Sequence, residues 1–114
     1  MSRDDATLLD MLKAARLVVA FKGNLTKKAF LRDVKTQSAI LHQLLVIGEA
    51  VKRLSDEFRA RYAEIPWVRI AGMRDKLIHA YDAVDLDEVW KTVTKDIAPL
   101  ISFLEPLVPQ EKTK

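Results

Sequence analysis

One short stretch of the chain combines the side chains that proton transfer and phosphate binding require. Within residues 74–81 stand a guanidinium (Arg74), a carboxylate (Asp75), an imidazole (His79) and a phenol (Tyr81). An unperturbed imidazole has a pKa of about 6.5 and can take or give a proton near neutrality, while a guanidinium offers paired donors to phosphate oxygens. The combination suits RNA cleavage without a metal ion, in which His79 takes the 2′-hydroxyl proton and Arg74 stabilises the phosphorane charge.

Helical spacing predicts that these polar groups point away from the core. At about 100° per residue, Asp75 and His79 fall on one face of a helix, and Arg74 and Tyr81 share a flank. An apolar stripe on the other side is formed by Ile70, Met73 and Leu77. We therefore expect Asp75 to accept a hydrogen bond from His79 and to fix its tautomer. Tyr81 could bind a phosphate or stack on a base.

Metal chemistry has little support in this sequence. The two histidines, His42 and His79, lie far apart in the chain, and there is no cysteine, whereas a zinc site needs three or four ligands. We expect neither a metal nor a cofactor. His42 is expected to line the bundle or a helix end, with a phosphate contact as the alternative. One imidazole per chain is not an acid–base pair, but two chains about a two-fold axis would bring two of each group into one cleft.

Composition and length predict one soluble domain over residues 1–114, with 110–114 as a mobile polar tail. The absence of cysteine is compatible with a reducing cytoplasm. The N-terminal residues do not resemble a signal peptide, and the longest apolar run is too polar to span a bilayer. We therefore expect a cytoplasmic protein with no membrane partner. The net charge of +3 permits a polyanionic partner without requiring one.

Hydrophobic spacing predicts an all-α fold, an up-down bundle of four main helices and one short helix. The expected main helices span about 4–21, 34–62, 67–80 and 86–104, and the short helix follows Thr26 and ends near Asp33. Thr26 and Asp85 are the expected N-caps. Pro99 is expected to kink or interrupt the last helix. The aromatic residues Phe58, Trp67 and Trp90 lie in apolar stripes, and we expect them in the core rather than as base-stacking platforms.

The longest predicted helix, 34–62, is apolar over much of its girth, so it is expected to be buried on two sides, one of which could face a second subunit. Gly48 within it would let another backbone approach closely, and Gly72 suggests close approach of another chain or a ligand. Glu49 is expected to be a paired or capping carboxylate inside the bundle, or alternatively a supporting group for the site. Arg53, four residues on, is its expected ion-pair partner.

An ordered set of blocks in the sequence resembles a known family. Arg74-Asp75-x3-His79-x-Tyr81 is similar to the Arg-x4-His-x-Tyr motif of the HepT-like ribonuclease toxins of the HEPN superfamily. The other blocks that carry the resemblance are Ile47-Gly48-Glu49-Ala50, Ile65-Pro66-Trp67, Ala71-Gly72-Met73-Arg74, Val84-Asp85-Leu86 and Val89-Trp90. Together they extend over most of the chain, from about Leu8 to Leu104.

The resemblance implies a HEPN-like, homodimeric bundle with both motifs facing one cleft. It implies a metal-independent endoribonuclease, the toxin of a type II toxin–antitoxin pair, with Arg74 and His79 as catalytic residues. Its partner would be a MntA-like nucleotidyltransferase antitoxin that transfers AMP to Tyr81 and so blocks RNA. The family often has Asn where this chain has Asp75, a carboxylate that could orient His79 but would also repel the substrate. The alternative is a non-catalytic helical binding subunit that docks with a nucleotidyltransferase and assists nucleotide or substrate binding.

Overall fold

The computed structural model describes residues 3–80 and 83–108, and within these ranges it is helical without any strand. The elements are α1 (Arg3–Lys22), α2 (Lys27–Phe30), α3 (Val34–Arg53), α4 (Asp56–Arg61), α5 (Trp67–His79), α6 (Leu86–Lys91), the π-helical turn η2 (Thr92–Asp96) and α7 (Ile97–Leu104). The expected all-α fold is therefore confirmed. None of the helices in the described part of the chain combines the length and apolarity needed to cross a membrane.

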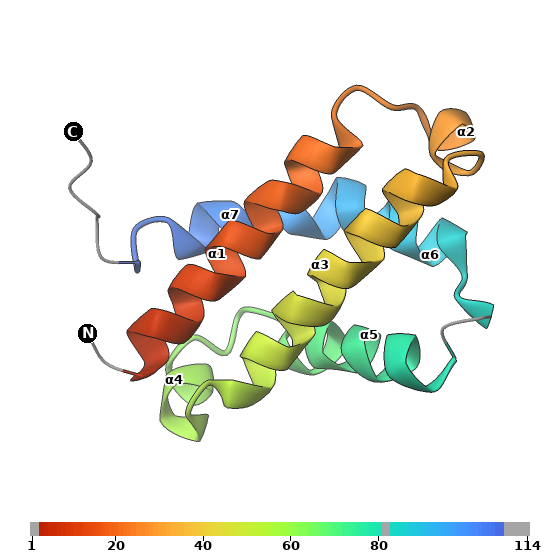
Figure 1. Cartoon of the computed structure of the whole chain (residues 1–114). Helices are drawn as coiled ribbons and strands as arrows, with labels where there is room; N and C mark the ends of the chain where they lie inside the picture. Colours follow the sequence, from red (N-terminus) through yellow and green to blue (C-terminus); the bar gives the residue numbers. More distant parts are fainter. Residues whose placement is uncertain (1–2, 81–82, 109–114) are drawn as a thin grey trace.

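The helices form two layers. The long helices α1 and α3 lie side by side, and the segment from α6 to α7 crosses behind them (Figure 1). Helix α7 packs on α1, and α5 packs on α3. The chain measures 40 × 36 × 20 Å along its principal axes, and its thinnest dimension equals about two helix diameters of roughly 10 Å. In so thin a molecule, much of α5 stays open to solvent.

Local capping signals fix several helix ends where the sequence places them. Thr26 caps α2, since its hydroxyl accepts from the backbone N–H of Ala29 at 3.1 Å, and the Asp85 carboxylate accepts from the first backbone N–H groups of α6. Asp33 caps α3 in the same way, and its hydrogen bonds from Thr36 lower its pKa. Gly23, at φ 49°, ends α1 in the left-handed region that glycine tolerates.

The predicted helix over 34–62 is wrong, because the chain breaks at Leu54 and Ser55 into α3 and α4. Leu54 is extended, with ψ 145°, and Ser55 starts a new helix by accepting from the N–H of Phe58 at 3.0 Å. Asp4 of α1 accepts from both the hydroxyl (2.8 Å) and the backbone N–H (3.0 Å) of Ser55. A serine able to cap, held by a carboxylate from another helix, outweighs the heptad-like spacing that runs through it.

The irregularity expected at Pro99 is present, but it lies upstream of the proline. The π-helical turn Thr92–Asp96 separates α6 from α7, and Pro99 lies within α7. A proline ring crowds the carbonyl four residues earlier, here that of Lys95, and the wider winding of the π-turn at Lys95 relieves such crowding. The last predicted helix is therefore two α-helices joined by a π-turn.

The aromatic side chains belong to the core, as expected. Trp67 is buried, and Phe58 and Trp90 are half-buried against the core cluster. The Trp90 ring lies 5.3 Å from that of Phe30, and the Trp67 ring lies 6.1 Å from that of Phe58. The expectation that His42 lines the bundle or a helix end is wrong: it is exposed in the middle of α3, because it points about 180° away from the buried seam of that helix.

Candidate active site

Arg74 lies where α5 crosses α3, and the crossing depends on a glycine. A Cβ added at Gly48 of α3 would lie only 2.2 Å from the Cβ of Arg74. No larger residue fits there unless α5 moves away from α3. The close approach expected at Gly48 is thus made by another helix of the same chain. Gly72 differs, since a Cβ there would meet no described atom within 4 Å.

The Arg74 guanidinium is held by two carboxylates. Its Nε donates to Oε2 of Glu49 at 2.9 Å, Nη2 donates to the same oxygen, and Nη1 donates to Oδ1 of Asp75 at 3.0 Å. These hydrogen bonds, that of Glu49 first, raise the pKa of Arg74 above its usual value, so the group stays charged. A guanidinium has five N–H donors, and three are used here. Within residues 3–80 and 83–108, two donors are left for a ligand on a side chain whose position is already fixed.

In the described part of the chain, Asp75 does not make the hydrogen bond to His79 that the sequence predicts. It accepts from Nζ of Lys52 at 2.7 Å and from Arg74 at 3.0 Å, and no hydrogen bond joins it to His79 in the described residues. Lys52 first, and then Arg74, lower its pKa. Asp75 and His79 are neighbours by spacing, but α3 brings a full positive charge to the carboxylate. Asp75 therefore orients Arg74 rather than the imidazole.

These contacts define an α3–α5 charge cluster of two cations and two anions, made by Glu49, Lys52, Arg74 and Asp75. Glu49 is a paired carboxylate, as expected, and its partner is the site arginine. The predicted partner was wrong, since Arg53 approaches Asp10 of α1 at 3.6 Å instead. Sequence reasoning missed Lys52 entirely. Its only signal was its place one helical turn after Glu49, on the face that carries Gly48.

His79 is the last residue of α5 and is exposed. It follows Arg74 by five residues, so the two side chains leave the helix about 140° apart. Arg74 turns towards α3 and His79 towards solvent, and the structure does not bring them together within one chain. Tyr81 lies outside the described residues, as does the predicted tail 110–114. Among the residues described, no group of three histidine, aspartate or glutamate side chains could hold a metal ion.

The sequence matches the family model described as Ribonuclease HepT-like over residues 11–107. A protein of Thermococcus cleftensis, described as a probable ribonuclease HepT, is 44% identical over 88% of this chain and 91% of its own. Two proteins described as candidate RNases are also similar. The protein of Caldanaerobacter subterraneus is 40% identical over 84% of this chain and 85% of its own length. The protein of Methanocaldococcus jannaschii is 37% identical over 90% of this chain and 85% of its own length. No solved structure matches the chain significantly.

Proposed function

Because this chain belongs to the HepT-like ribonuclease family, we propose that it is an endoribonuclease that cleaves RNA without a metal ion. The observation that carries the proposal is the state of Arg74. It belongs to the α3–α5 charge cluster, its hydrogen bonds to Glu49 and Asp75 keep it charged, and two of its donors have no partner among the described residues. A preoriented guanidinium with free donors is suited to stabilise charge that develops on a phosphate.

His79 supplies the proton transfer in this mechanism. The imidazole takes the proton of a ribose 2′-hydroxyl, and the 2′-oxygen attacks the adjacent phosphorus. Arg74 binds the non-bridging oxygens as negative charge builds up. The bond from phosphorus to the 5′-oxygen then breaks, and the leaving oxygen takes a proton from a second acid, for which an imidazolium is suited near neutrality. The products are a 2′,3′-cyclic phosphate and a 5′-hydroxyl.

The second imidazole would come from a second copy of the chain. Arg74 and His79 of one helix diverge by about 140°, so a two-fold partner is needed to bring one of each together. Exposed apolar residues lie on the side of α5 between the directions of Arg74 and His79, where Val68 is 88% and Ile78 is 46% exposed. A second copy packed over this side would bury them and place the two motifs in one cleft.

The reaction itself is the first test of this function. We expect the purified chain to cleave single-stranded RNA in excess EDTA and to leave 2′,3′-cyclic phosphate ends, detected by mass spectrometry of the fragments. A mechanism of this kind needs only side chains, so the chelator should leave the rate unchanged. Cleavage that stops in EDTA and returns with a divalent cation would overturn the metal-independent mechanism.

We also propose that the enzyme is a cytoplasmic toxin neutralised by a nucleotidyltransferase. Tyr81 follows His79 by two residues, and an AMP group there would add a negative phosphate beside the cleft and repel RNA. On co-expression with a MntA-like nucleotidyltransferase, we expect the intact mass of this chain to rise by whole AMP units and its cleavage to be lost. After the same co-expression, Tyr81→Phe should show no added AMP mass and should still cleave RNA, because it lacks the hydroxyl that would receive AMP. A mass increase that persists in Tyr81→Phe would place the modification elsewhere.

A non-catalytic binding subunit is the second candidate. It is favoured by one observation, that the carboxylates of Glu49 and Asp75 already occupy Arg74 within a single chain. Such a subunit would associate with a nucleotidyltransferase and leave RNA intact in the EDTA assay.

A further inference from the structure

A groove lies between α5 and the segment formed by α6 and η2, next to the site but outside the α3–α5 charge cluster. It has a volume of about 320 Å³. Its lining residues are Arg69, Gly72, Met73, Lys76, Glu88, Lys91, Thr92, Lys95 and Asp96. It continues towards the end of α5 into a second hollow of about 220 Å³, and Met73, Lys76 and Glu88 line both.

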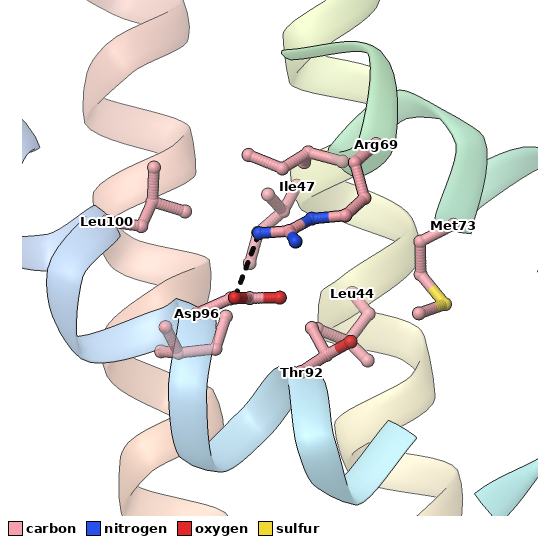
Figure 2. Close-up of a pocket in the computed structure, with 9 residues that line it drawn as sticks. Leu44, Ile47, Arg69, Met73, Thr92, Asp96 and Leu100 are labelled. Atoms are coloured by element: carbon pink, nitrogen blue, oxygen red, sulfur yellow. Dashed lines mark hydrogen bonds and ion pairs between the residues drawn. The ribbon is translucent and has the colours of Figure 1, made fainter. Parts of the chain in front are cut away.

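Positive charge dominates the groove. Four of its lining residues are cations and two are carboxylates. Arg69 and Asp96 form an ion pair, with Nη2 and Oδ1 3.0 Å apart, and both line a small, mostly apolar pocket of about 40 Å³ between α3, α5, η2 and α7 (Figure 2). The three lysines, Lys76, Lys91 and Lys95, make no ion pair within the described residues. In the part of the chain that the structure describes, the groove therefore presents ammonium groups without an ion-pair partner from both of its walls.

The π-turn shapes one wall. A π-helix closes its hydrogen bonds over five residues instead of four, so residues four apart come closer to alignment than in an α-helix. This winding brings Lys91 and Lys95 to the same groove, together with Thr92. Such turns occur often at functional sites. On the other wall, Lys76 precedes His79 by three residues, so the imidazole leaves α5 one turn further on and about 60° around the helix from this lysine.

We propose that this groove binds the phosphate backbone of the RNA strand that His79 cuts, with Lys76, Lys91 and Lys95 as its contacts. The inference rests on the proposed ribonuclease function and adds the path of the substrate to it. Unpaired lysines along an open groove suit a strand with regularly spaced negative charges, because they contact phosphates irrespective of base. Glu88 at the border opposes this charge and limits how deeply phosphates enter.

The test compares two variants with the same change in net charge. Lys91→Glu with Lys95→Glu reverses the groove, and Lys13→Glu with Lys28→Glu reverses two exposed lysines of α1 and α2 that form no ion pair in the described chain. The probe is a fluorescent single-stranded oligoribonucleotide, 2′-O-methylated throughout so that it cannot be cleaved. Anisotropy is measured across a salt series. We expect the groove variant to bind at least about tenfold more weakly than the control variant, and to lose roughly 1.4 from the slope of log K against log salt, as for two lost phosphate contacts.

Equal affinities and salt slopes for the groove and control variants would overturn the inference, and an acidic protein surface would then be the better partner for these lysines. The milder pair Lys91→Gln with Lys95→Gln should shift binding in the same direction by a smaller factor, and circular dichroism checks that all variants stay helical. A measurement of RNA cleavage by the same variants distinguishes a failure of the groove assignment from a failure of the ribonuclease function. A selective loss of binding in the groove variant supports the groove even if the wild type cuts no RNA. If His79→Ala abolishes cutting while the groove and control variants bind alike, the ribonuclease stands and the groove assignment fails.

Discussion

Replacing His79 with alanine is expected to lower the rate of RNA cleavage by about 10²- to 10⁴-fold, the usual range for loss of a general acid–base group. The residue is exposed at the end of α5, and no hydrogen bond of the described residues depends on its side chain. The helical content and the unfolding temperature should therefore stay at their wild-type values. Initial rates on a fluorescent RNA, measured with circular dichroism melting curves on the same preparations, check both halves of this prediction.

The chain provides its own control for this substitution. His42 is also exposed, lies in the middle of α3 and is directed away from the buried seam. His42→Ala should leave cleavage unchanged. Equal activity in wild type and His79→Ala would end the catalytic assignment of His79, whereas equal losses in the two histidine variants would indicate a general effect on the protein rather than on proton transfer.

The fold could be predicted from the sequence where local signals agree with the hydrophobic pattern. Thr26, Asp85 and Gly23 mark helix ends by chemistry that needs only their immediate neighbours. The prediction failed at Ser55, where the apolar spacing continues through a cap that Asp4 of another helix supports. A contact between residues 51 positions apart leaves no trace in a local pattern.

The sequence singles out candidate site residues on α5, but it does not show their contacts with other helices. Spacing along α5 makes Asp75 a neighbour of His79, yet the structure pairs it with Lys52 and Arg74. The difference comes from the close crossing of α3 and α5 at Gly48, which brings Glu49 and Lys52 within reach of α5. The sequence shows that a glycine stands at position 48, but it does not show which helix packs against it. The ion pairs between α3 and α5 form because α5 is the helix that packs there.

Replacing Arg74 with alanine is expected to lower cleavage by about 10²- to 10³-fold, as when one preorganised donor to a developing oxyanion is lost. The change also leaves the Glu49 carboxylate without its cation, while Lys52 still pairs with Asp75. Some loss of thermal stability should therefore accompany the loss of rate. Arg53→Ala is the matched control, since it removes a guanidinium of α3 that lies outside the α3–α5 charge cluster and approaches Asp10 of α1. It should keep full activity in the RNA assay.

A mixture of wild type and His79→Ala shows whether each cut needs the imidazoles of both subunits. If the base and the acid come from the two subunits of one dimer, a dimer with one His79→Ala subunit lacks one of them and is inactive. About a quarter of the dimers in an equal co-expression mixture carry two wild-type subunits, so the rate should be about a quarter of that of the same amount of wild type. The divergence of Arg74 and His79 by about 140° around α5 is the physical reason to expect groups of both subunits in one cleft. A rate of about half that of wild type would mean that each chain cuts RNA with its own imidazole alone.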